Sequence, residues 1–156
     1  MLRSLVFAFI LCYCTACVGE VNKDPISVEM KLEIENGKVV ANLIFLNGGK
    51  KEIWLEKLKV GYLGVIMNRA FKVNLKLGSE SIEYKGLFVS PAVVNNDRFI
   101  KLGIGESIEN RVVLSDYYEL KPANNTYEVQ YNTLSAPKEE SDLFILLKSD
   151  KVIITF

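Results

Sequence analysis

The sequence predicts an all-β domain, an immunoglobulin-like antiparallel β-sandwich, and three observations favour this fold class. Apolar and polar residues alternate with a period of two along most of the chain from residue 26 onward. Turn-forming residues interrupt the alternation about every 8 to 12 residues. No stretch carries a helical period over three turns. Two amphipathic sheets can bury their apolar faces against each other without any helix, so a two-layer sandwich satisfies the pattern.

The first two strands form the clearest hairpin. Residues 26–35 alternate throughout, so their apolar side chains share one face of the strand. Asn36 and Gly37 follow, and both tolerate the positive φ angles that a two-residue hairpin turn requires. Residues 38–46 return as the second strand. The expected core face of this strand consists of Val39, Ala41, Leu43 and Phe45.

Two further alternating runs follow this hairpin. They cover residues 52–60 and 70–77, and turn-forming residues separate them from their neighbours. In the first run we expect Ile53 to face inward and Glu56 to face outward, because they lie an odd number of residues apart. In the second run the expected inward residues are Phe71, Val73, Leu75 and Leu77.

The rest of the middle region gives shorter signals. Residues 80–84 and 99–102 are short alternating runs, and we expect each to form a strand. Residues 62–68 are apolar but interrupted by glycine, which predicts a loop or a short irregular strand. Residues 87–96 contain a Ser-Pro pair and two asparagines, which is a loop composition.

The last third of the chain predicts four more strands and one helical turn. The strands are residues 106–114, 126–132, 143–148 and 151–156. The last two would form a terminal hairpin around Ser149 and Asp150. Ser115 would cap a single helical turn over residues 115–120, and residues 136–142 are charged and predict a mobile loop. The chain then carries about nine strands, which is typical of a sandwich.

The N-terminus predicts a bacterial lipoprotein signal. Arg3 precedes a short apolar run, and small residues follow it. Thr15, Ala16 and Cys17 resemble the end of a lipobox, although Cys14 stands where leucine is usual. We therefore expect a signal peptide over residues 1–16, a short tether over 17–25 and a β-sandwich domain over 26–156. Cleavage before Cys17 would expose its amine and thiol for acylation. Ordinary cleavage nearby would instead give a secreted protein, and either outcome is extracytoplasmic.

Composition disfavours several other functions. The only cysteines are Cys12, Cys14 and Cys17, too few for a zinc site without histidine and without partners for a disulfide framework. The chain has no histidine, the commonest general base and metal ligand. Its 19 basic and 19 acidic residues cancel, so no charge excess favours nucleic acid. We expect no enzyme activity, no cofactor and no metal, and we interpret the acidic residues of 139–142 as solvent-facing rather than as a calcium site.

Several short pieces suggest a family. Along the chain they are VVANLIFLNGGKKEIWL, SIEYKG, LGIGES, VLS, YEL and TYEV. In order and spacing these pieces resemble the N-terminal β-domain of deuterolysin-type zinc endopeptidases, the aspzincins. The resemblance covers roughly residues 25–131. It implies structural roles for Gly86, Gly105 and Tyr118, whose positions match turn and core positions of that domain.

Tyr127 also has a structural interpretation that is independent of the resemblance. It begins a predicted strand shortly after a turn, which is the position of a tyrosine corner, whose hydroxyl bonds back to a nearby backbone group. The resemblance also implies what this chain lacks. The catalytic domain of that family carries an H-E-x-x-H zinc site, and a chain without histidine cannot assemble it. We therefore expect the β-domain to stand alone.

These observations predict a non-catalytic, extracytoplasmic binding domain that is attached to the membrane by a lipid on Cys17. An alternative is a protease-associated domain that binds or inhibits a metallopeptidase. A histidine-free hydrolase would require Asp116, Glu119 and Lys121 to converge in one cleft. Aromatic residues near predicted turns could form the binding surface or simply pack over the ends of the sandwich. They are Trp54, Tyr62, Phe88, Tyr117 and Tyr118.

Overall fold

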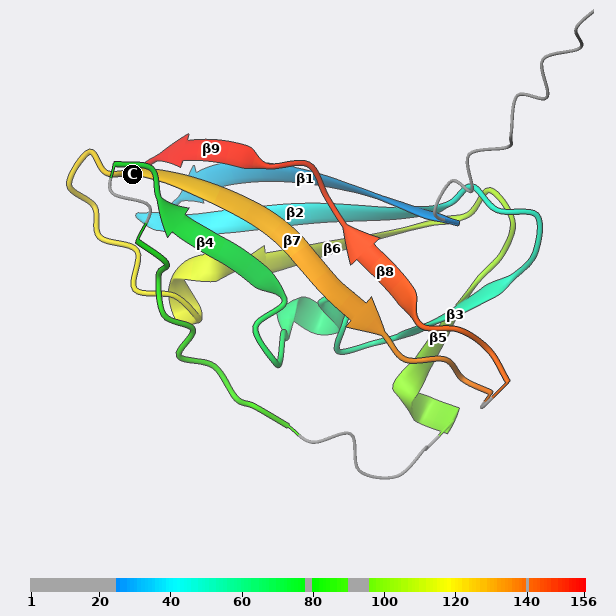
Figure 1. Cartoon of the computed structure of the whole chain (residues 1–156). Helices are drawn as coiled ribbons and strands as arrows, with labels where there is room; N and C mark the ends of the chain where they lie inside the picture. The colour runs from blue at the N-terminus through cyan, green and yellow to red at the C-terminus, as the bar shows by residue number, and fades with distance from the viewer. Residues whose placement is uncertain (1–24, 78–79, 90–95, 140) are drawn as a thin grey trace, which may run out of the picture.

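The computed structural model describes residues 25–77, 80–89, 96–139 and 141–156, and it confirms the predicted all-β class (Figure 1). Nine strands and three short 3-10 turns lie within these residues. The strands are β1 (Ile26–Glu35), β2 (Lys38–Asn47), β3 (Ile53–Glu56), β4 (Phe71–Leu75), β5 (Phe99–Leu102), β6 (Ser107–Val113), β7 (Thr126–Ser135), β8 (Ile145–Lys148) and β9 (Val152–Thr155). The 3-10 turns are η1 (Tyr62–Gly64), η2 (Asn96–Arg98) and η3 (Leu114–Asp116).

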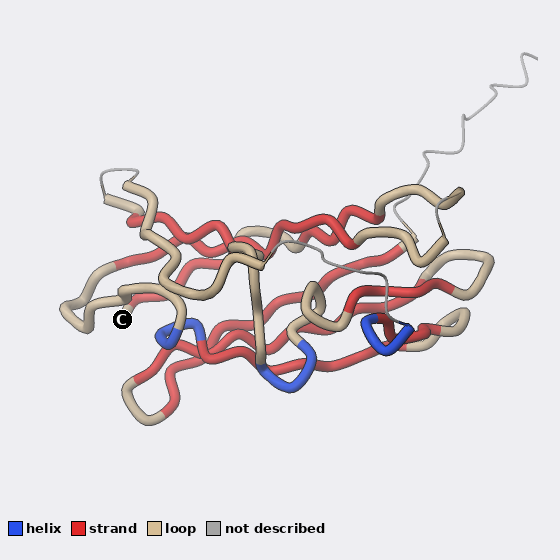
Figure 2. Tube along the Cα trace, turned by 90° about the horizontal axis from the view of Figure 1, so that it is seen from below, coloured by secondary structure: helices blue, strands red, loops and turns tan. Residues whose placement is uncertain are grey.

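The strands form antiparallel sheets that face each other across one core. One sheet has the order β1–β2–β6, and a second is built on β7, with β4 along one side and both β8 and β9 along the other. A two-stranded sheet of β3 and β5 lies toward one end (Figure 1). Seen from below, the strands lie in two layers with loops at both ends (Figure 2). At one edge of the sandwich Val28 of β1 forms an isolated bridge with Ser149.

The first hairpin forms as predicted. Asn36 and Gly37 have φ angles of 48° and 70°, and they join β1 to β2 with Ile34 opposite Val39. The predicted core face of β2 is completely buried. Phe45 from this face meets Tyr131 of the opposite sheet edge to face, with 5.5 Å between ring centroids. The core therefore lies between the two sheets, as the alternation requires.

Three predictions in the middle of the chain were wrong. β3 ends at Glu56, and residues 57–61 turn instead of continuing the strand. Residues 80–84 do not form a continuous strand, because only Ser81 and Tyr84 make isolated bridges. Leu77 was expected to face inward but is 84% exposed. β4 ends at Leu75, opposite Tyr127 near the start of β7, so Leu77 lies beyond the paired region.

The terminal hairpin prediction was also wrong. β8 and β9 each pair antiparallel with β7 and not with each other, so they run in the same direction along it. Ser149 is buried between β8 and β9, and it forms hydrogen bonds with both the carbonyl and the N–H of Tyr131. Its N–H donates to the Tyr131 carbonyl at 3.0 Å, and its Oγ accepts from the Tyr131 N–H at 3.1 Å. Ser149 therefore continues the line of pairing with β7 instead of reversing the chain.

Ser115 had been predicted to cap a helical turn, but it does not. The 3-10 turn η3 begins one residue earlier, at Leu114, and makes no side-chain cap hydrogen bond. The Ser115 Oγ instead accepts the N–H of Val39 at 2.9 Å. This bond fastens the chain after β6 to the start of β2.

Candidate functional site

The residues singled out by the sequence fall into two groups. Cys17, the signal peptide and residues 17–24 lie outside the described residues. Tyr127, Tyr118, Gly105 and Gly86 are all described, and each has a structural role. Within the described ranges no helix is long and apolar enough to cross a membrane, and no group of acidic residues is arranged to hold a metal ion.

Tyr127 makes the contact that defines a tyrosine corner. Its ring is buried near the start of β7, and its Oη accepts the backbone N–H of Lys121 at 2.9 Å. Tyr118 forms a similar hydrogen bond to the backbone of the opposite sheet, since its Oη donates to the carbonyl of Phe71 at 2.8 Å. Burial raises the pKa of the Tyr118 hydroxyl well above its ordinary value. Both hydroxyls thus bind backbone groups in the interior.

Gly105 and Gly86 are required by local geometry. Gly105 has a φ of +73° in the turn between β5 and β6, a conformation that glycine adopts without strain. Its N–H donates to the carbonyl of Asn47 at 2.8 Å, so the turn is attached to the end of β2. At Gly86 a Cβ atom would lie 2.2 Å from the Tyr84 hydroxyl. The Tyr84 ring therefore covers Gly86 and leaves no room for a side chain.

The aromatic residues predicted near turns divide between two places. Tyr117, Tyr118 and Phe88 gather around Tyr84, with ring centroids 5.3 to 6.2 Å from its own. Trp54 and Tyr62 are not part of this cluster and contact lysines instead. Lys138 lies over the Trp54 ring at 3.5 Å from its centroid, and Lys57 lies at 5.5 Å from the Tyr62 centroid.

Of the three residues required for a histidine-free hydrolase, Glu119 and Lys121 lie near each other, and Asp116 is paired with a different residue. Asp116 is paired with Lys38 at 2.7 Å, and Glu119 is paired with Lys85 at 2.7 Å. Lys121 lies 4.0 Å from Glu119. These side chains are at least half exposed, and the lysines around Glu119, chiefly Lys85, lower the pKa of its carboxyl. The arrangement is one of exposed ion pairs.

The strongest candidate site lies beside the ends of β3, η2 and β7. A hollow of about 310 Å³ is found there, and we call it the groove. Val89 and Leu134 on its wall are 42% and 52% exposed. The groove is lined by Glu56, Leu58, Lys59, Met67, Asn68, Val89, Arg98, Leu134, Ala136 and Phe144. Six of these ten residues are apolar.

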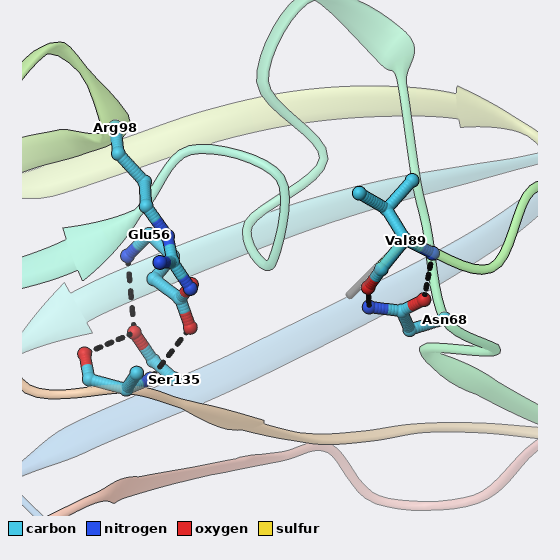
Figure 3. Close-up of polar contacts among 6 residues, drawn as sticks. Glu56, Asn68, Val89, Arg98 and Ser135 are labelled. Atoms are coloured by element: carbon cyan, nitrogen blue, oxygen red, sulfur yellow. Dashed lines mark hydrogen bonds and ion pairs between the residues drawn. The ribbon is translucent and has the colours of Figure 1, made fainter. Parts of the chain in front are cut away.

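A buried ion pair lies in the wall of the groove (Figure 3). Glu56 is only 3% exposed, and its carboxylate binds the guanidinium of Arg98. The other carboxylate oxygen accepts the N–H of Ala136 at 2.6 Å. The N–H of Glu56 donates to the Ser135 Oγ at 3.0 Å. One glutamate thus joins the end of β3 to η2 and to the end of β7.

Asn68 holds the opposite wall of the groove (Figure 3). Its side-chain amide pairs with the backbone of Val89 in both directions. Nδ2 donates to the Val89 carbonyl at 2.8 Å, and Oδ1 accepts the Val89 N–H at 2.7 Å. Asn68 has a φ of 59°, a left-handed conformation that asparagine tolerates better than most residues. The Val89 backbone is fixed, and its side chain is left exposed.

A second hollow of about 410 Å³ lies beside the groove, and Phe144 lines both. Its lining includes Pro25, Lys51, Trp54 and Lys138. It also contains three exposed apolar residues that follow one another closely in sequence, which we call the tip. They are Leu143, Phe144 and Leu146.

Sequence reasoning missed the central residue of this site. Glu56 was expected to face outward, but it is buried. The prediction failed because the partner of Glu56, Arg98, lies 42 residues further along the chain. The pairing of β3 with β5 sets Glu56 opposite Phe99 and so brings Arg98 within reach. No local pattern encodes this pairing. The apolar run 143–146 was visible in the sequence, but as part of a strand.

No protein-family model matches the sequence, and no curated protein matches it. The resemblance to the aspzincin β-domain therefore stays a prediction.

Proposed function

We propose that this chain is a non-catalytic binding domain of the bacterial cell envelope, anchored by a lipid on Cys17, and that its groove receives an apolar segment of a partner protein. The observation that carries the proposal is the groove itself. It presents Val89 and Leu134 to solvent on walls that Asn68 and Glu56 hold in place. Exposed apolar residues around a hollow are typical of a protein interaction site.

The rigidity of the walls favours binding. The Val89 backbone is bound by two hydrogen bonds from Asn68, and the end of β7 is bound through Glu56. A preorganised surface loses little conformational entropy when a partner docks, which leaves more of the interaction energy for affinity. The fixed polar groups sit in the walls, and the apolar side chains remain available for contact.

The strand order supports the finer, immunoglobulin-like interpretation of the fold. The order β1–β2–β6 corresponds to strands A, B and E of an immunoglobulin domain, and β4–β7–β8/β9 corresponds to C, F and G. Tyr127 then stands near the start of strand F, where the tyrosine corner of that fold occurs. Domains of this architecture place their binding loops at the ends of the sandwich, and the groove lies at one end.

The lipid anchor is tested by labelling with a radioactive fatty acid. Wild-type protein should be labelled in cells, and Cys17→Ala should not, because the acylated thiol is gone. Cys12→Ala is the matched control, since it changes a cysteine of the signal peptide and should leave labelling intact. Undiminished labelling of Cys17→Ala would defeat the anchor.

The groove is tested by capturing partners from an envelope extract. The double variant Leu58→Ser with Val89→Ser should lose a protein that the wild type retains. Ile153→Ser is the control, because Ile153 is an apolar residue that is 51% exposed but lies on β9, away from the groove. A partner retained by all three proteins would place the interaction elsewhere.

The sequence resemblance favours one alternative for the partner, a metallopeptidase that the domain binds or inhibits. The matching pieces around Gly105, Tyr118 and Tyr127 form one continuous unit from the end of β5 to β7. Adding the purified domain to a deuterolysin-type peptidase tests this alternative. Slower proteolysis with wild type, but not with the groove variant, would support it, and unchanged proteolysis would exclude inhibition.

A further inference from the structure

We infer that the tip rests on the surface of the bilayer that holds the lipid anchor. The inference rests on the proposed anchor at Cys17 and adds a second, apolar contact with the membrane. Leu143 is 86% exposed and Phe144 is 64% exposed, side by side in the chain. Two large apolar side chains so exposed are disfavoured in water and favoured at the boundary between headgroups and acyl chains.

The position of the first described residue supports the bilayer as the surface that the tip contacts. Pro25 is the first described residue, and it lines the same hollow as Leu143 and Phe144. The start of β1 and the loop between β7 and β8 also lie at the same end of the molecule, away from the C-terminus (Figure 1). An anchor attached through Pro25 would therefore hold this end, rather than the opposite one, toward the membrane.

The length of the tether limits how far the tip can lie from the bilayer. Eight residue steps lead from Cys17 to Pro25, and a fully extended chain of that length spans at most about 26 to 29 Å. A tip confined within that distance meets the bilayer as an intramolecular partner, at a high effective concentration. Weak insertion of a few side chains is then sufficient to keep it in contact.

The residues around the tip have the chemistry of a membrane interface. Trp54 lines the hollow, and tryptophan is enriched at the level of lipid headgroups. Lys51 and Lys138 also line it, and lysine can keep its ammonium group in water while its methylenes lie against apolar material. Glu52 and Asp142 are also present, so we attribute the contact to the apolar side chains rather than to net charge.

Trp54 provides the test, because it is the only tryptophan in the chain. The full chain would be expressed in a bacterium, purified from membranes and reconstituted into vesicles of phosphatidylethanolamine and phosphatidylglycerol. The acyl chains would be brominated in one preparation and ordinary in the other. Bromine quenches tryptophan at short range, so we expect lower Trp54 emission in the brominated vesicles. Equal emission in both preparations would overturn the inference.

The double variant Leu143→Ser with Phe144→Ser should lose this quenching while still floating with the vesicles, because its anchor is intact. Leu77→Ser is the control, since Leu77 is 84% exposed, close to Leu143, but lies beyond β4. It should be quenched like the wild type. If the double variant is quenched as strongly as wild type, the tip is not the contact. Loss of a dimer in the double variant, without quenching in the wild type, would assign the tip to a second copy of the chain.

A second preparation separates this inference from the proposed anchor. The chain from Cys17 onward contains every described residue and only that cysteine, so a thiol-reactive lipid coupled to it supplies an anchor whether or not cells acylate it. Failure of the cell-derived protein to float would defeat the proposed anchor alone. Absence of quenching in the coupled protein would defeat the contact of the tip alone.

Discussion

The two ends of β7 use apolar and aromatic residues in opposite ways. Near its start, Tyr127 is buried and its hydroxyl is bound to the backbone of Lys121. At its far end, Leu134 is exposed beside the groove, next to a buried ion pair. Both ends belong to one strand of one sheet. The chain is therefore able to bury apolar residues along this strand, and the exposure of Leu134 at the second end needs another explanation.

This contrast separates residues that specify the fold from residues that are available for binding. At the first end Tyr127 packs in the core, and its hydroxyl binds a backbone group. At the second end Glu56 and Arg98 occupy buried space that apolar residues could fill at similar stability. Their effect is to fix the geometry of the groove.

The largest effect is expected for Glu56→Ala. The substitution leaves Arg98, whose side chain is 19% exposed, without its carboxylate, and it removes the acceptor of the Ala136 N–H. Breaking one side of a buried ion pair typically costs about 3 to 5 kcal/mol. Urea denaturation should show a loss of that size. Glu52→Ala is the control, because Glu52 pairs with Lys101 at the surface and should cost about 1 kcal/mol or less.

The buried tyrosines should differ according to their hydrogen bonds. Tyr118→Phe and Tyr127→Phe each remove a bond to the backbone, and we expect each to lower the free energy of unfolding by about 1 to 2 kcal/mol. Tyr131 provides the comparison, because its buried hydroxyl has no hydrogen-bond partner within the described residues. Tyr131→Phe should be neutral or stabilising. An unchanged denaturation midpoint for Tyr127→Phe would remove the tyrosine corner from the account.

The same tyrosines predict how stability depends on alkaline pH. Burial raises the pKa of Tyr118 and Tyr131 above the ordinary value near 10. Below that value both are neutral in the folded and the unfolded chain, so they contribute no pH dependence. Above it only the unfolded chain releases these protons, and the free energy of unfolding falls by up to about 1.4 kcal/mol per pH unit for each tyrosine.

Denaturation midpoints measured between about pH 10 and 11 check this slope. Tyr131→Phe should show a shallower decline than the wild type, because one titrating group is gone. Parallel declines in the two proteins would mean that Tyr131 does not titrate as its burial requires.

The smallest effect on stability is expected at the tip. Leu143→Ser with Phe144→Ser should change the free energy of unfolding by no more than about 0.5 kcal/mol, because exposed side chains contribute little to folding. Leu147→Ala in the same strand region is the control, since Leu147 is completely buried and should cost about 2 to 5 kcal/mol. A large loss for the tip variant would make the tip part of the core and weaken the contrast between the two ends.

Sequence reasoning predicted local features better than contacts between distant residues, for a physical reason. Alternation and the Asn36–Gly37 turn are local signals, and they were sufficient for β1, β2 and the core face of β2. Glu56 and Ser149 take their roles from strand pairings between residues far apart in the chain. Such pairings leave no local pattern, so both the buried ion pair and the arrangement of β8 and β9 were missed. The prediction for Leu77 was wrong because the alternation of apolar and polar residues does not show where strand pairing ends.

The central claim is that the groove, and not the end around Tyr127, binds the partner protein. The most direct measurement introduces a photo-crosslinking amino acid at Val89 in living cells, with Leu77 as the reference position. We predict that irradiation gives a discrete protein adduct at Val89 and none at Leu77. An adduct at Leu77 alone, or no adduct at Val89 in cells that carry the anchored protein, would contradict the account.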